Sequence, residues 1–293
     1  MPPSRRNRRV KKDSDSQLKK ALNLREFYPS RSNDVRKGDF GRVIICGGSD
    51  RYAGCLAFNA LAALRSGADL AIVVAPRRAA DIVAGYSPDL ITVPCDSPFP
   101  DPDIAIELLE NADSLVMGCG VTRTPESHRA LLDIIQRCKT PMVLDAEALH
   151  SIAAAPDAIK GKQVLLTPNV GEYRVLSGAL WPENVDGKRD AVQTLAKQYK
   201  TTVIVKGAVD FISDGERIHL DTAGSPYMTK GGYGDLLAGV AGAHLARGRN
   251  PFDAAKAAAF IVGKAGELAG AWFGESVLAS DVLSHIDLVV RSR

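Results

Sequence analysis

Three glycines stand within four positions of one short segment, and an aspartate follows them. The segment runs from Thr229 to Asp235, reads Thr-Lys-Gly-Gly-Tyr-Gly-Asp, and leads into an apolar run with helical spacing. Glycine lets a backbone approach a ligand closely, and the free N–H groups of a helix N-terminus bind anions such as phosphate. The carboxylate of Asp235 would repel phosphate, but it could accept the proton of a hydroxyl that attacks phosphorus. The segment therefore predicts either a phosphoryl-transfer site or a glycine-rich loop with Asp235 as an N-cap.

A lysine directly follows a second informative segment, the apolar run Thr202–Val205. An ammonium group without a partner is costly to bury, so we expect Lys206 to meet an anion or to lie at the rim of a crevice. One interpretation is a contact with nucleotide phosphates, in which case Lys206→Ala weakens nucleotide binding with little effect on folding. The alternative is a surface lysine at the end of a strand.

Polar side chains also follow two other apolar runs. Asn169 and Glu172 are three residues apart, which places them on the same side of a helix, where an amide and a carboxylate could hold a hydrated Mg²⁺. The default interpretation is a capping box, in which the two residues only close the start of the helix. Asp145 and Glu147 follow another strand, and one of these carboxylates could orient a substrate or metal while the other starts a helix.

The elements that must position these residues alternate between short apolar runs and Ala/Leu-rich helical patterns. Uninterrupted apolar strands separated by helices are typical of a mostly parallel sheet covered by helices on both faces, and the carboxyl ends of such strands line a ligand crevice. The sequence therefore predicts an α/β fold. The expected strands are Val43–Cys46, Leu70–Ala75, Leu90–Val93, Ser114–Met117, Met142–Leu144, Val164–Leu166 and Thr202–Val205.

The pattern changes after Lys206. Two β-type runs flank Asp214-Gly215, which predicts a hairpin with a tight turn over residues 209–220. The glycine-rich segment follows, and then two Ala-rich helices are expected over Asp235–Leu245 and Asp253–Ala269.

Charge is distributed unevenly along the 293 residues, which carry a formal net charge of +3. Eight basic and two acidic side chains fall in the first twenty residues, and almost none there is apolar. We expect residues 1–35 to form a basic, largely disordered tail and residues 36–293 to form one domain. The rest of the chain has no basic excess and no long apolar run, so neither nucleic acid nor a membrane is an expected partner. Five widely spaced cysteines without a CxxC pair indicate reduced thiols in a cytoplasmic protein.

Three common signatures are absent from the sequence. It contains no G-x-x-x-x-G-K-[ST] P-loop, no G-x-G-x-x-G after an early strand, and no G-x-S-x-G elbow. P-loop enzymes, Rossmann dinucleotide folds and α/β-hydrolases are therefore disfavoured.

Several segments, taken in order, resemble the ADP/ATP-dependent NAD(P)H-hydrate dehydratases, which belong to the ribokinase-like superfamily. The resemblance covers roughly residues 36–272. The segments are Lys37–Val43, Gly47–Ser49, Val143–Leu149, Leu165–Glu172, Val205–Gly207, Gly224–Met228 and Gly231–Asp235.

The resemblance implies repair of hydrated NADH and NADPH: the 6-hydroxyl is phosphorylated by ADP or ATP with Mg²⁺, and phosphate then leaves. It also implies a homo-oligomer, since the family often forms tetramers. The implied catalytic base is Asp235, which also contacts the substrate. The implied nucleotide-binding residues are Lys206, Gly207, Ala208, Val209, Asp210, Gly231, Gly232 and Gly234. The remaining implied substrate contacts are Cys55, Gly120 and Asn169, with Asn169 and Glu172 on a water-mediated Mg²⁺.

The chain departs from the family pattern at several positions. The family usually has Ala at Cys55, His at Asn169, Asn at Ser225 and Ser or Thr at Tyr233, and it has Pro-Gly-Leu-Gly in place of residues 119–122. These changes affect the substrate side more than the phosphate side. A kinase of a sugar or vitamin-precursor hydroxyl is the alternative function, and a nucleotide-binding homologue without turnover is a third.

Overall fold

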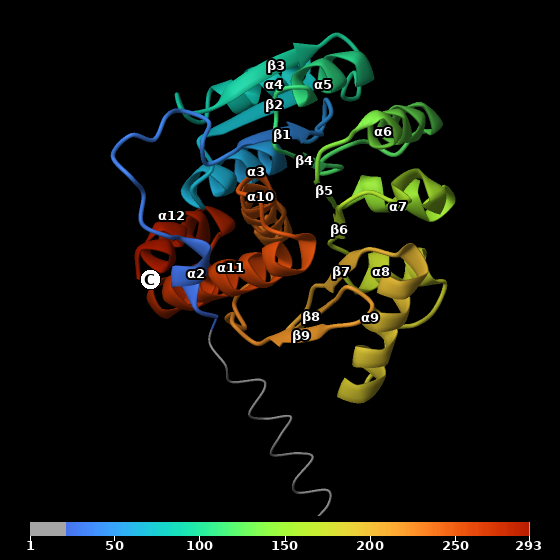
Figure 1. Ribbon diagram of the computed structural model, residues 1–293, viewed down its shortest axis with the longest axis vertical. Helices are drawn as coiled ribbons and strands as arrows, with labels where there is room; N and C mark the ends of the chain where they lie inside the picture. Colours follow the sequence, from blue (N-terminus) through green and yellow to red (C-terminus); the bar gives the residue numbers. More distant parts are fainter. Residues whose placement is uncertain (1–21, 293) are drawn as a thin grey trace, which may run out of the picture.

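The computed structural model describes residues 22–292, and one nine-stranded sheet runs through them (Figure 1). The strand order is β3-β2-β1-β4-β5-β6-β7-β8-β9. Strands β1 to β7 are parallel, and β8 and β9 add an antiparallel hairpin at one edge, so the predicted α/β sheet and hairpin are both confirmed. The strands are β1 Arg42–Cys46, β2 Leu70–Pro76, β3 Ile91–Cys95, β4 Ser114–Met117, β5 Met142–Leu144, β6 Val164–Leu166, β7 Thr202–Val205, β8 Asp210–Ser213 and β9 Ile218–Asp221.

Helices cover both faces of the sheet, because alternate strand residues face opposite sides and both sides are apolar. In β1, Val43 and Ile45 join one core cluster, whereas Ile44 and Cys46 join the other. The first cluster is covered by α3 Gly54–Arg65, α4 Arg77–Ala84, α10 Tyr233–Ala246, α11 Pro251–Phe273 and α12 Ala279–Arg291. The second is covered by α5 Pro102–Leu109, α6 Pro125–Arg137, α7 Glu147–Ala154, α8 Val170–Ser177 and α9 Val185–Tyr199.

A short helix, α2 Leu24–Phe27, lies before the point at which the domain is expected to begin. Its residues Leu24 and Phe27, and Tyr28 after it, are buried in the first core cluster. The Tyr28 hydroxyl lies 3.1 Å from Nε2 of His244, a buried residue of α10. Residues 24–28 therefore belong to the folded domain and not to a disordered tail that extends to residue 35. The expected tail over residues 1–21 lies outside the described residues.

Helix α10 packs unusually close to its neighbours, and two glycines make this possible. A Cβ atom at Gly239 would lie 2.2 Å from the carbonyl oxygen of Asn59 on α3, and one at Gly242 would lie 2.3 Å from a methyl group of Val116 on β4. The first turn of α10 is thereby held near the carboxyl ends of the central strands. None of the helices between residues 22 and 292 combines the length and apolar character needed to cross a bilayer.

Candidate active site

The glycine-rich segment forms the N-terminus of α10, as the sequence predicts. Gly232 is the N-cap with φ of 105°, a backbone conformation that favours glycine. No side chain caps this helix end, so its first N–H groups and the positive end of the helix dipole are available to an anion. Asp235 is the third residue of the helix, so its interpretation as the N-cap is wrong.

Lys206 meets an anion at the end of β7, which confirms one of the two expectations for it. Its Nζ lies 2.8 Å from Oδ1 of Asp145, and both side chains are largely buried. Burial alone would lower the pKa of Lys206, but the charges of Asp145 and Glu172 outweigh burial and raise it. Lys206 therefore carries a positive charge inside the protein.

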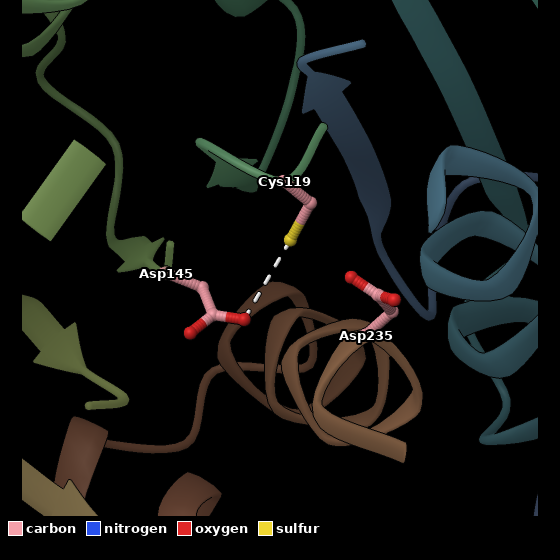
Figure 2. Close-up of side chains that lie close together, drawn as sticks. All are labelled: Cys119, Asp145 and Asp235. Carbon is pink, nitrogen blue, oxygen red and sulfur yellow. Dashed lines mark hydrogen bonds between the residues drawn. The ribbon is translucent and has the colours of Figure 1, made fainter. Parts of the chain in front are cut away.

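Three side chains from different elements converge beside this ion pair. Figure 2 shows Cys119 after β4, Asp145 after β5 and Asp235 on α10 pointing toward one another. One ligand atom from each lies within 4.8 Å of the others, and the Cys119 Sγ donates to Oδ2 of Asp145 at 3.6 Å. Because Lys206 already holds Oδ1 of Asp145, the group resembles a proton-accepting site more than a cation site.

Burial and the nearby charge of Asp145 raise the pKa of Asp235 to about 6. Cys119 and Lys206 act in the opposite direction, and Asp235 forms no ion pair with any residue in the described part of the chain. A carboxylate with a pKa near 6 is mostly ionised at neutral pH, yet it binds a proton more readily than an ordinary aspartate. These are the properties that a general base needs.

The two thiols in this region are not nucleophiles. Burial and the charge of Asp235 raise the pKa of Cys55 to about 12 and that of Cys119 well above its usual range. Both residues therefore act as small, protonated side chains at neutral pH.

A cavity of about 600 Å³ opens on one side of the first turn of α10. Its walls include Lys206, Gly207, Ala208, Asp210 and Gly234, which are expected nucleotide contacts, together with Ala and Val residues of α11. Three further expected nucleotide contacts lie elsewhere: Val209 packs against the second core cluster, Gly231 is exposed, and Gly232 lines a different cavity.

A second cavity of about 540 Å³ opens on the other side of the same turn. It contains Cys55, Gly120 and Asp235, three of the four expected substrate contacts, and also Gly232. Gly234 and Asp235 are neighbours in sequence, yet they line different cavities, so the first turn of α10 separates the two. A larger depression of about 710 Å³, between α4 and the end of β3, lies away from this cluster and contains none of these residues.

The capping interpretation of Asn169 and Glu172 is confirmed. The Asn169 side chain accepts from the N–H of Glu172 at 2.9 Å, and the Glu172 carboxylate accepts from the N–H of Asn169 at 2.8 Å. Asn169 is exposed and does not line the cavity that contains Cys55. Burial, followed by the charge of Asp145, raises the pKa of Glu172, while Lys206 acts in the opposite direction.

The two carboxylates after β5, Asp145 and Glu147, have different partners. Glu147 starts α7 and binds Arg123 at 2.8 Å and His128, away from the cluster of Cys119 and Asp235, whereas Asp145 faces that cluster.

The sequence did not identify Tyr52 and Phe58, which also line the cavity of Asp235. The position of Tyr52 just after Gly47-Gly48-Ser49, in a loop at a strand end, is the signal that could have found it.

A mostly parallel sheet, with a helix N-terminus and an aspartate between two cavities at the strand ends, defines a ribokinase-like α/β protein. The fold agrees with solved structures: a Streptococcus mutans protein matches with a TM-score of 0.82 at 24% identity, covering 93% of this chain and 99% of that one. A Bacillus subtilis ADP/ATP-dependent NAD(P)H-hydrate dehydratase, crystallised with ATP and Mg²⁺, matches with a TM-score of 0.78 at 23% identity, covering 92% and 95%.

The family model described as NAD(P)H-hydrate dehydratase matches residues 43–288, and the chain belongs to this family. An ADP-dependent (S)-NAD(P)H-hydrate dehydratase from Cenarchaeum symbiosum is 36% identical over 273 residues, covering 92% of this chain and 94% of the relative. A bifunctional NAD(P)H-hydrate repair enzyme from Pyrobaculum aerophilum is 37% identical over 267 residues, covering 89% of this chain. The chain spans about half (53%) of that relative's length.

Proposed function

We propose that this protein restores hydrated NADH and NADPH by a dehydration that consumes ADP or ATP. The observation that carries the proposal is the first turn of α10, where Gly234 lines one cavity and the next residue, Asp235, lines the other. A nucleotide in the first cavity and a hydroxyl in the second would meet at this turn. Family membership favours a dehydratase over the alternative sugar or vitamin-precursor kinase.

In the first step, Asp235 accepts the proton of the 6-hydroxyl while the hydroxyl oxygen attacks the terminal phosphorus of the nucleotide. AMP leaves if the donor is ADP, and ADP leaves if the donor is ATP. The N–H groups at the start of α10 and the Lys206 ammonium stabilise the charge on the moving phosphoryl group. In the second step, the ring nitrogen donates its electron pair, the C6–O bond breaks and phosphate leaves. Loss of a proton from C5 then restores the dihydropyridine ring.

Charge at the site also supports Mg²⁺ as a cofactor. Asp145, Glu172 and Asp235 interact with one another and with a single ammonium, Lys206, so an anionic nucleotide would enter a region of excess negative charge. Asn169 and Glu172 would hold the ion through water, since one oxygen of Glu172 remains outside its capping bond. The ion would neutralise phosphate charge when bound.

The test is an incubation of the purified protein with hydrated NADH and either ADP or ATP. We expect reduced nicotinamide and free phosphate to form in equal amounts, with no phosphorylated organic product. A stable phosphorylated alcohol from another substrate would favour a kinase. Nucleotide binding without turnover of hydrated NADH, hydrated NADPH or any candidate alcohol would favour the non-catalytic homologue and remove the enzyme proposal.

We propose that the protein acts in the cytoplasm as a homo-oligomer, with four copies by analogy with the family. All five cysteines are free, which fits a reducing compartment. Trp272 is 82% exposed at the end of α11, and the side chains of Phe273 and Leu278, which follow it in sequence, are also exposed. Exposed apolar surface of this kind is typical of subunit contacts. Sedimentation of the wild type and Trp272→Glu tests this point, with dissociation of a larger species expected for the variant.

A further inference from the structure

Asp145 contacts functional groups on both sides of the first turn of α10. Its Oδ1 accepts from the Lys206 ammonium at 2.8 Å, and its Oδ2 accepts from the Cys119 thiol at 3.6 Å. Lys206 lines the cavity of about 600 Å³ proposed for the nucleotide, called the nucleotide cavity below. Cys119 and Asp235 line the cavity of about 540 Å³ proposed for the substrate, called the substrate cavity below. Asp145 itself is buried at the end of β5 and is not in either cavity wall.

Lys206 also lies directly against the helix end that would bind phosphate. A Cβ atom at Gly234 would be 3.2 Å from Nζ of Lys206 and 3.9 Å from Oδ2 of Asp145. The absence of a side chain at Gly234 thus leaves room for the ammonium at the N-terminus of α10. Without Asp145, nothing else within hydrogen-bond distance in the described residues would hold the ammonium there.

The backbone beside Asp145 is strained. Ala146 has φ of 48° and ψ of −117°, a conformation that residues with a side chain rarely adopt. Such strain costs on the order of 1–3 kcal/mol and clusters at functional sites, where the surrounding structure enforces it. Here it turns the chain from β5 into α7 so that Asp145 and Glu147 face different partners.

We propose that Asp145 is a positioning residue that links the two cavities: it fixes the Lys206 ammonium at the nucleotide, and its negative charge keeps Asp235 ready to accept a proton. This inference rests on the proposed function. It assigns the ion pair a role in proton transfer as well as in phosphate binding.

The protonation of Asp235 depends on charged and titratable groups from five elements. Asp145 and Glu172 favour its protonated form, and Lys206 favours its ionised form. Asp145 acts more strongly than Glu172 and Lys206, and it is the group that Lys206 neutralises directly. Among the described residues, the groups that interact with Asp235 are Cys55 on α3, Cys119 after β4, Asp145 after β5, Glu172 on α8 and Lys206 after β7. Arg51 and Tyr52, which precede α3, line the same cavity as Asp235.

Two substitutions in the pair should move the protonation of Asp235 in opposite directions. The acidic limb of the pH profile of kcat/KM reports the protonation of Asp235. In Asp145→Asn this limb should move to lower pH by about one unit, because Asp235 loses a negatively charged neighbour. In Lys206→Met, assayed at saturating nucleotide, the limb should move to higher pH, because Asp145 is no longer neutralised. A purely structural role would lower activity without moving the limb.

Glu147→Gln is the matched control, because it removes a carboxylate two residues away that binds Arg123 and His128 instead. Its acidic limb should stay at the wild-type pH. An unmoved limb in folded Asp145→Asn would overturn the proposal. If that variant does not fold, as judged by thermal melting, an unmoved limb in Lys206→Met would do so.

A measurement without turnover separates this inference from the proposed function. Calorimetry of ADP binding across pH should show affinity falling as Asp235 ionises, with the midpoint at lower pH in Asp145→Asn than in wild type. The titrations of ADP itself and of Asp210, which lines the nucleotide cavity and has a pKa raised to about 7, are common to both proteins and cancel in the comparison. A wild type that binds ADP but does not restore hydrated NADH would refute the proposed function only, whereas identical midpoints would refute the role of Asp145.

Discussion

The two cavities beside α10 are lined by different kinds of residue. The nucleotide cavity is formed largely by backbone and small residues, such as Gly207, Ala208, Ala259 and Gly263. The substrate cavity has larger side chains in its wall, including Arg51, Tyr52 and Phe58, together with the protonated thiols of Cys55 and Cys119. A backbone cradle suits a phosphate chain that many proteins bind, whereas side chains select one substrate. Phosphate-side residues should therefore affect nucleotide affinity, and Asp235 should affect the chemical step.

The largest effect is expected for Asp235→Asn. The variant should lower kcat by about 10²-fold or more, since it removes the proton acceptor and keeps the shape of the side chain. At pH 5, where Asp235 of the wild type is mostly protonated and as neutral as the asparagine, nucleotide affinity should remain within about threefold of wild type, because Asp235 lines the other cavity. Steady-state rates with hydrated NADH and calorimetry with ADP check both statements. Wild-type turnover in this variant would exclude Asp235 as the base.

Lys206→Ala should act on the other cavity and weaken nucleotide binding by about tenfold, the equivalent of about 1.4 kcal/mol. The sequence alone suggested little effect on folding, and the structure corrects this expectation. Lys206 and Asp145 form a buried pair, so removing one partner should cost about 3 kcal/mol of unfolding free energy. Calorimetry and urea unfolding measure the two effects, with the exposed Arg129→Ala as the control. Unchanged affinity for ADP would contradict the nucleotide assignment.

Asp210, which also lines the nucleotide cavity, should make the free energy of unfolding depend on pH. Burial raises the pKa of Asp210 to about 7, so the folded protein binds a proton there that the unfolded chain releases above pH 4. The resulting stabilisation is fully present below about pH 4 and is lost as pH rises through about 7. Asp210→Asn keeps an acceptor for the N–H of Gly207 and should flatten this decline. Urea unfolding at pH 5 and pH 8 checks this, and an equally steep decline in the variant would refute it.

The smallest effect is expected for Cys55→Ala, which introduces the residue that the family usually has. Because the thiol is protonated, it contributes volume and no charge, and kcat/KM for hydrated NADH should stay within about threefold of wild type. A tenfold loss would show that Cys55 takes part in selecting the substrate, and the contrast between the cavities would then be sharper than proposed.

Local patterns in the sequence predicted most of the fold. All seven parallel strands, the hairpin and the helix after the glycine-rich segment are confirmed, because each depends on apolar periodicity or turn residues close in sequence. Helix α12 is missing from the sequence expectations, although the spacing of Val282, Ile286 and Val289 on its buried face carries the signal. Helix α2 is too short for periodicity to reveal it.

The site was predictable only in part. The helix N-terminus without a side-chain cap and the candidate base Asp235 followed from residues 229–235 themselves. The partner of Lys206 did not, because Asp145 lies 61 positions earlier and only the order of strands β5, β6 and β7 brings the two together. The raised pKa of Asp235 depends on the same three-dimensional arrangement.

The central claim is that the hydroxyl on the substrate side attacks phosphorus before it leaves the ring. Hydrated NADH labelled with ¹⁸O at the 6-hydroxyl tests this claim directly, with mass spectrometry of the phosphate released by the wild-type protein and ADP or ATP. We predict one ¹⁸O atom in each phosphate formed, because the C6–O bond breaks after the O–P bond has formed. Unlabelled phosphate with the ¹⁸O in water would contradict the account.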